Sequence, residues 1–141
     1  MDSSQLGQRQ TRQREAIFQV IEVANGPLSV PEIHERACVL FPSLGIATVY
    51  RTVKLLQDAG RIQSVVLPTG DTRYEETGLG HHEHFQCRKC EQVFDINVCP
   101  VHFPKGQPIA GGFIVEDHEL TIYGLCPDCA PKIVRRLKSR Q

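Results

Sequence analysis

The alternation of apolar and polar positions divides the chain near residue 60 into a helical part and a strand-rich part. The first helix is predicted over residues 12–23, where apolar side chains recur at helical spacing, and Asn25-Gly26-Pro27 ends it. The apolar positions of this helix are Ala16, Ile17, Val20, Ile21 and Val23.

A second helix is predicted to begin at Ser29. Serine is a favourable cap residue, Pro31 lies in the first turn, and Glu32 follows the cap by three residues, as in a capping box. The helix is expected to end near Phe41-Pro42 and to turn three apolar residues inward: Ile33, Ala37 and Leu40.

A third helix is predicted after Gly45, in the segment IATVYRTVKLLQDAG. Val49, Val53 and Leu56 form one apolar stripe along it, and Gly60 is a typical C-terminal stop.

Strand signals replace this helical pattern after residue 60. The runs RIQSVV and TRYE flank the turn signal Pro68-Thr69-Gly70-Asp71 and predict a β-hairpin. Three helices and a hairpin, in this order, are typical of a winged helix-turn-helix DNA-binding domain, which we place at residues 1–76. Residues 77–80 are expected to form a hinge. Residues 81–141 contain strand-like segments at HEHFQC, QVFDI and HELTIYG and a basic helix from Pro127 onward. The predicted fold class is therefore α+β, with a small C-terminal α/β domain.

Composition adds little to this picture. The formal net charge is zero, with 16 Lys and Arg against 16 Asp and Glu. DNA binding would therefore require basic residues to gather on one face. The candidates are Arg12, Arg14, Arg51, Lys54 and Arg73. The N-terminal residues are polar, and no apolar run approaches the ~20 residues that cross a bilayer, so we expect a soluble, cytoplasmic protein.

Two cysteine pairs, Cys87-x-x-Cys90 and Cys126-x-x-Cys129, have the spacing of tetrahedral zinc ligands. A closed four-thiolate site would stabilise the fold without catalysing a reaction. Disulfides and thiols that are oxidised for signalling are the alternatives. Cys38 is interpreted as a small apolar residue of the second helix, and the role of Cys99 is open.

The run HHEHFQCRKC holds three histidines and a glutamate before the first cysteine pair. Because side chains alternate along a strand, His82 and His84 should face one way, and His81 and Glu83 the other. One strand would then serve two metal sites, whose mixed nitrogen and oxygen ligands suit iron(II), manganese(II), cobalt(II) or zinc. Further ligand candidates are Glu75, Glu76, Asp95, His102, Glu116, Asp117 and His118.

Three motifs, ATVYRTV, HHEHFQCRKC and CPDC, resemble the ferric uptake regulator family of bacterial metal-responsive repressors, in the family's order and spacing. The resemblance implies a homodimer with a winged helix and a C-terminal dimerisation domain. It also implies structural zinc at the cysteine pairs and recognition-helix residues at Thr48, Tyr50 and Arg51. The implied regulatory metal site comprises Glu75, His82, His84 and Asp95, and an additional site comprises His81, Glu83, His102 and His118.

The chain departs from the family pattern at three places. Many members have a histidine ligand before the second helix, where this chain has Gly26-Pro27-Leu28, and His34 lies further into the helix. The regulatory site would then be smaller, or would be completed by water, Gln63 or Cys99. The zinc-sensing branch has a hinge cysteine where Glu75 and Glu76 stand. The segment CPVHFPKGQPIAGG holds three prolines and three glycines, so a dimerisation helix there must be short.

These features predict a repressor of metal uptake or homeostasis genes that binds a palindromic DNA operator and responds to iron or manganese. An aspartate at position 95 is found in peroxide-sensing members, so peroxide sensing and zinc sensing are the alternatives within the family. A zinc-dependent hydrolase is more remote, because the chain offers no further nucleophile or oxyanion site. A dithiol catalyst is disfavoured because the second matched cysteine pair favours tetrahedral zinc. A metal-binding interaction module is a further remote alternative.

Overall fold

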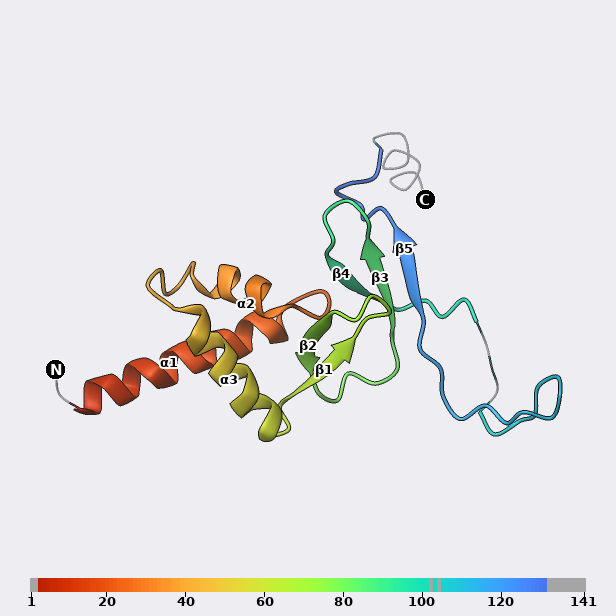
Figure 1. The fold of residues 1–141 in the computed structure, drawn as a ribbon, viewed down its shortest axis with the longest axis horizontal. Helices are drawn as coiled ribbons and strands as arrows, with labels where there is room; N and C mark the ends of the chain where they lie inside the picture. The colour runs from red at the N-terminus through yellow and green to blue at the C-terminus, as the bar shows by residue number, and fades with distance from the viewer. Residues whose placement is uncertain (1–2, 102, 104, 132–141) are drawn as a thin grey trace. The chain divides into compact units, whose positions relative to one another are not determined.

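A computed structural model describes residues 3–101, 103 and 105–131. The chain forms two compact units, Met1–Leu79 and Gly80–Gln141 (Figure 1). None of the helices in the described part is long and apolar enough to cross a membrane.

The first unit contains three helices and a hairpin in the predicted order. The helices are α1 (Ser3–Glu22), α2 (Val30–Ala37) and α3 (Ile46–Asp58). The strands β1 (Ile62–Val66) and β2 (Thr72–Glu76) pair antiparallel, with Ser64 opposite Tyr74. The isolated bridge from Leu28 to Tyr74 joins the α1–α2 connection to the hairpin. This arrangement confirms the predicted winged helix.

The core of the first unit is formed by the apolar faces of the three helices. Ile17, Ile33 and Val49 are fully buried there, one from each helix. Their burial follows from the helical spacing of the apolar residues, which places all three faces against one another. Two predicted core residues are exposed instead, because the helices end before them: Val23 follows α1, and Leu40 lies in the turn after α2.

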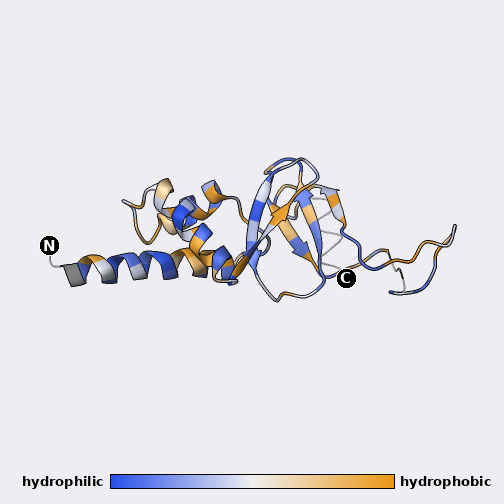
Figure 2. Cartoon of the chain, turned by 60° about the horizontal axis from the view of Figure 1, so that its bottom comes forward, coloured by the Kyte–Doolittle hydropathy of each residue, from blue (hydrophilic) through white to orange (hydrophobic). Residues whose placement is uncertain are grey.

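Helix α1 begins nine residues before its predicted start. Figure 2 shows that its N-terminal part is mainly hydrophilic and that apolar residues gather toward its C-terminal end. Residues such as glutamine and arginine have good helix propensity, but they give no apolar period. The periodicity therefore marked only the part of α1 that packs in the core.

The start of α2 has the predicted capping box. The Ser29 side chain accepts a hydrogen bond from the Glu32 backbone N–H, and the Ser29 backbone N–H donates to Glu32 Oε1 at 3.1 Å. Both bonds satisfy backbone groups that a helix start leaves without partners. Glu32 Oε1 also accepts a 2.6 Å ion-pair hydrogen bond from Arg73 on β2, which ties the helix to the hairpin.

The second unit is a three-stranded sheet in the order β4-β3-β5. Strand β3 (Glu83–Cys87) pairs antiparallel with β4 (Val93–Ile96) and parallel with β5 (Thr121–Gly124). Among its described residues, only three apolar side chains are buried: Cys87, Val93 and Cys126. This unit therefore has little apolar core of its own.

The connection from β4 to β5 contains no helix in its described residues, and its one β-bridge joins Pro108 to Ile114. The three prolines and three glycines in its first half account for this, since both residue types oppose helix formation. The basic helix expected from Pro127 onward falls mostly on residues 132–141, which lie outside the described residues.

Candidate metal sites and nucleic-acid interface

The four cysteines of the two CxxC pairs meet at one edge of the second unit's sheet. Strands β3 and β5 are parallel, and Cys87 at the end of β3 lies opposite Gly124 at the end of β5. Parallel strands end at the same edge, so the turns that follow them are neighbours. The backbone N–H of Cys129 bonds to Cys126 O at 3.0 Å, which closes the second turn.

The sulfur positions fit a tetrahedral zinc site. All four Sγ atoms lie within 4.8 Å of one another, and Cys90 Sγ is 3.8 Å from Cys126 Sγ. Four sulfurs at 2.3 Å from a central zinc ion would be separated by about 3.8 Å. No cysteine forms a disulfide in the structure. The geometry favours zinc ligation over the two alternatives raised by the sequence.

The cysteine cluster also favours thiolate at one position. Hydrogen bonds from the backbone N–H groups of Cys126 and Cys90 lower the pKa of Cys87 to about 6, although burial opposes this change. Contact with Cys126 raises the pKa of Cys129 to about 12, and burial adds to the increase. Sulfurs this close resist carrying negative charge together, which a divalent cation among them would relieve.

The histidines at the start of β3 alternate between two faces, as predicted. On one face, His82 Nε2 lies 3.5 Å and His84 Nε2 lies 3.4 Å from Asp95 Oδ1. His84 and Asp95 are direct partners in the β3–β4 register, and both side chains are mostly buried. Two imidazoles and one carboxylate therefore converge as potential ligands within the second unit.

The remaining predicted ligand of this group, Glu75, lies on β2 in the first unit. Its Oε1 atom accepts a 2.9 Å hydrogen bond from Gln63 on β1. His34 is engaged elsewhere, with Nε2 2.7 Å from Leu44 O and 3.3 Å from Cys38 Sγ. Cys38 itself packs partly buried against the core, as predicted.

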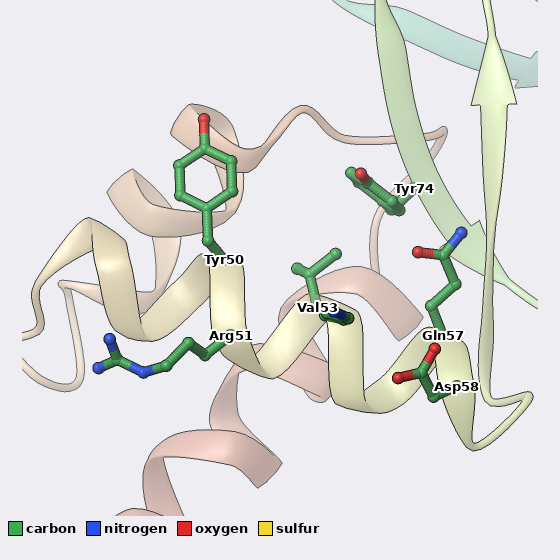
Figure 3. Close-up of a pocket in the computed structure, with 7 residues that line it drawn as sticks. Tyr50, Arg51, Val53, Gln57, Asp58 and Tyr74 are labelled. Carbon is green, nitrogen blue, oxygen red and sulfur yellow. The ribbon is translucent and has the colours of Figure 1, made fainter.

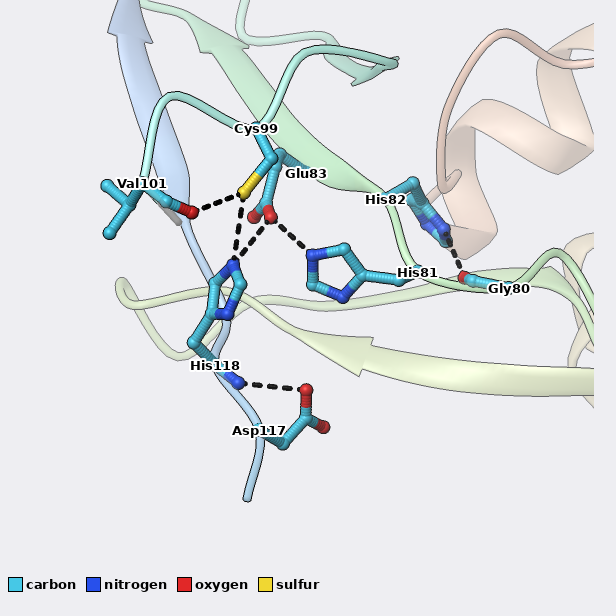
Figure 4. Close-up of polar contacts among 8 residues, drawn as sticks. All are labelled: Gly80, His81, His82, Glu83, Cys99, Val101, Asp117 and His118. Atoms are coloured by element: carbon cyan, nitrogen blue, oxygen red, sulfur yellow. Dashed lines mark hydrogen bonds and ion pairs between the residues drawn. The ribbon is translucent and has the colours of Figure 1, made fainter. Parts of the chain in front are cut away.

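The opposite face of β3 carries a second cluster. Glu83 Oε1 lies 2.6 Å from His81 Nε2 and 3.0 Å from His118 Nε2 (Figure 4). His118 precedes β5 by three residues, just as His81 precedes His84 by three, and the parallel register pairs His84 with Thr121. Three residues of the predicted additional site are thus together, whereas the fourth, His102, lies outside the described residues.

The structure brings Cys99 into this second cluster. Its Sγ atom is 3.3 Å from His118 Nε2, and ligand atoms of Cys99, His81, Glu83 and His118 all lie within 4.8 Å of one another. The sequence offered Cys99 only as a possible ligand of the regulatory site, whereas the structure places it in the cluster on the opposite face of β3. The sequence did not predict this position, because Cys99 lies beyond the end of β4 in an irregular segment. The only available signal was its place among other potential ligands.

Glu83 has the properties of a ligand rather than of a surface carboxylate. It is 1% exposed, and its Oε2 atom has no hydrogen-bond partner among the described residues. Burial raises the pKa of this carboxyl, but Cys99, His81 and His118 outweigh that effect and hold it below its usual value. A buried, ionised carboxylate with an unsatisfied oxygen is what a cation site requires.

In the first unit, α3 presents a polar face beside the hairpin. Tyr50 is 56% exposed, and Arg51 donates a 3.1 Å hydrogen bond from Nη2 to Thr48 Oγ1. Figure 3 shows Tyr50 and Arg51 on the same turn of α3, with their side chains pointing in different directions. Both residues line a groove of about 710 Å³. The groove also contacts Lys54 and extends to Tyr74 of the hairpin. Arg12 and Arg14 are exposed on α1.

Arg73 differs from the other candidates for DNA contact. Its side chain is 7% exposed and is paired with Glu32, so the expectation that it faces DNA is corrected for this structure. Its position on β2 turns it inward, because alternate strand residues face the helices. The guanidinium stabilises the first unit through its ion pair with Glu32.

We expect Arg73→Ala to lower the free energy of unfolding by ~1–3 kcal/mol, because the change removes a charged hydrogen-bond partner from the mostly buried Glu32 carboxylate, which keeps its bonds to Ser29. Urea denaturation followed by circular dichroism measures this change. Arg51→Ala is the control, since an exposed substitution should stay within ~0.5 kcal/mol. Unchanged stability in Arg73→Ala, together with weaker DNA binding, would restore Arg73 to the DNA interface.

Comparisons with known proteins find matches that cover most of the chain. The profile of the Ferric uptake regulator family matches residues 5–123. A ferric uptake regulation protein of Rhizobium leguminosarum bv. viciae is 34% identical over 121 residues, which cover 84% of each protein. A peroxide-responsive repressor, PerR, of Staphylococcus saprophyticus is 29% identical over 133 residues, covering 89% of this chain and 85% of the relative. A solved structure described as a zinc-bound manganese uptake regulator has a TM-score of 0.65 and 28% identity, covering 81% of this chain and 87% of that one.

Proposed function

This chain belongs to the ferric uptake regulator family, and on that basis we propose that it represses metal uptake or homeostasis genes when a divalent metal ion occupies the site at His82, His84 and Asp95. Members of this family are metal-responsive transcriptional regulators and not enzymes. The observation that carries the proposal is the convergence of His82 and His84 on Asp95, only a few residues after the linker at 77–80.

Zinc at Cys87, Cys90, Cys126 and Cys129 has a structural role in this proposal. The four thiolates fill a tetrahedral shell and leave no open position for a substrate or a signal. The ion holds together the ends of β3 and β5, in a unit that has little apolar core.

The regulatory ion couples metal binding to DNA binding through the linker. His82, His84 and Asp95 hold it on the C-terminal unit, and we assign Glu75, on the DNA-binding unit, as a further ligand. Shared ligation of this kind would restrict motion at residues 77–80. Reciprocal coupling of the two affinities is typically ~1–3 kcal/mol, which corresponds to roughly 5–150-fold in DNA affinity.

The DNA partner is a palindromic operator bound by a homodimer in the cytoplasm. A single winged helix reads only a short site, so two copies at matched spacing are needed for specific binding. The exposed Tyr50 and Arg51 near the N-terminal end of α3 fit base and phosphate contacts in the major groove, with Lys54, Arg12 and Arg14 toward the backbone.

The sensed metal is iron(II) or manganese(II) in this proposal. Imidazole and carboxylate ligands without a thiolate suit both ions, and Glu75 and Glu76 stand where zinc sensors of the family have a hinge cysteine. Peroxide sensing is the second candidate. It is supported by Asp95 beside both histidines and by the 29% identity to the peroxide-responsive repressor.

One titration separates these functions. Anisotropy of a labelled operator is measured against iron(II), manganese(II) and zinc(II) under anaerobic conditions, and then again after peroxide. Tight binding with iron or manganese supports the proposal, and loss after peroxide with a gain of about 16 Da on His82 or His84 supports peroxide sensing. Operator binding that is unaffected by all three metals would overturn both metal sensing and peroxide sensing.

We expect Arg51→Ala to weaken operator binding by ~1–3 kcal/mol and to lower its sequence preference, because an arginine that contacts bases contributes to both affinity and specificity. Lys105→Ala, an exposed change of equal charge in the second unit, is the matched control. Equal losses in the two variants, measured by anisotropy at several salt concentrations, would show that only net charge matters and that α3 does not read DNA.

A further inference from the structure

We infer that Cys99 is a thiolate ligand of the additional metal site, which the family resemblance places at His81, Glu83 and His118 without a cysteine, and that the ion fastens the irregular β4–β5 connection to the sheet. This inference goes beyond the proposed function, because the regulatory ligands lie on the opposite face of β3. The ion belongs to the class that accepts sulfur and nitrogen together, such as zinc or cobalt(II).

The geometry of the cluster supports ligation by all four side chains. Figure 4 shows the Glu83 carboxylate and the Cys99 sulfur beside the rings of His81 and His118, while His82 turns toward Gly80 and away from them. Glu83 Oε1 is 2.6 Å and 3.0 Å from the two imidazole nitrogens, and Cys99 Sγ is 3.3 Å from His118 Nε2. Neighbouring ligands around a tetrahedral zinc ion are separated by roughly 3.3–3.6 Å, so small adjustments would admit the ion.

Glu83 independently indicates a cation. Its side chain is 1% exposed, and Oε2 has no hydrogen-bond partner among the described residues. A buried carboxylate oxygen without a partner is costly, and coordination to a cation would remove that cost. The site therefore does not depend on the cysteine alone.

The positions of the ligands along the chain indicate that the ion holds the β4–β5 connection. Cys99 lies three residues after β4, and His118 lies three residues before β5, so the two bracket residues 100–117. Ile109, Phe113 and Ile114 within this stretch are exposed, and hence apolar packing does little to hold it. Joining its two ends to His81 and Glu83 would close a long loop, which reduces the conformations available to it.

Cobalt(II) reports directly on the sulfur ligand. Protein that holds one zinc ion per chain is titrated with cobalt(II) under anaerobic conditions, and zinc retention is checked after each addition. We expect a near-ultraviolet sulfur-to-cobalt charge-transfer band that saturates once the cluster is filled, while cobalt(II) at His82, His84 and Asp95 adds no sulfur band. The band should be lost in Cys99→Ser and kept in Cys38→Ser, a matched thiol outside the cluster. A band that persists in Cys99→Ser, or the absence of a band at saturating cobalt(II) in the unsubstituted protein, would overturn the inference.

Hydrogen–deuterium exchange tests the role of the ion. Added zinc should slow exchange in peptides from residues 100–117 of the unsubstituted protein but not of Cys99→Ser, and equal slowing in both would refute the fastening role. Operator binding is measured on the same samples. Metal-dependent binding that survives loss of the charge-transfer band would leave the proposed function intact, whereas binding that never depends on metal would contradict the proposed function alone.

Discussion

A Cys87→Ser variant loses its structural zinc and, with it, the fold of the second unit. Apparent zinc-binding free energies of ~10–16 kcal/mol in small zinc-dependent domains show how much folding energy such a site supplies. Cys87 is fully buried and contacts the other cysteines at the end of β3, so serine would leave an incomplete shell there. The described part of the unit buries only three apolar side chains, two of them cysteines of this site, and has little else to stabilise it.

Zinc content, circular dichroism and sedimentation velocity of the variant measure this outcome. We expect about one zinc ion less per chain, loss of the sheet signal and a monomer, while the helical signal of the first unit remains. Cys38→Ser, whose thiol lies outside the metal clusters, should keep zinc and oligomeric state. A stable, zinc-replete dimer of Cys87→Ser would show that the ion is not structural.

A His84→Ala variant keeps its fold and its dimer but loses the response of DNA binding to metal. His84 lies 3.4 Å from Asp95 and carries no part of the apolar core, so its removal affects the regulatory site more than stability. Loss of the metal response should reduce operator affinity by roughly 5–150-fold in the presence of metal, because the coupling between metal binding and DNA binding is typically of that size. His82→Ala should behave in the same way.

Fluorescence anisotropy with and without iron(II) or manganese(II) measures the response. His34→Ala is the matched control, because this histidine contacts Leu44 and Cys38 in the first unit. It should keep the metal response and lose only some stability. A normal metal response in both His82→Ala and His84→Ala would remove these residues from the regulatory site.

Much of the fold was predictable because its signals are local. The capping box at Ser29, the stripe on α3 and the turn between β1 and β2 are each encoded within a few residues. The alternation of His81 to His84 followed from strand geometry alone. The two faces of β3 were therefore foreseen before any partner of these histidines was known.

The remaining features depend on contacts between distant segments. The parallel pairing of β3 with β5 brings Cys126 to Cys87 and His118 to His81, and no local pattern encodes it. The inward turn of Arg73 depends on Glu32, 41 residues away in the sequence. Cys99 reaches Glu83 and His118 through an irregular segment, whose path neither periodicity nor spacing predicts.

The scarcity of buried apolar side chains in the second unit has a consequence for the lifetime of the protein. An unfolded segment is cleaved by proteases, and ligand binding to the native state protects against this in proportion to ligand supply. Because thiols form most of that small core, the amount of intact regulator in a cell should fall during zinc starvation, whichever metal it senses. Zinc supply would then set how many copies are available to respond.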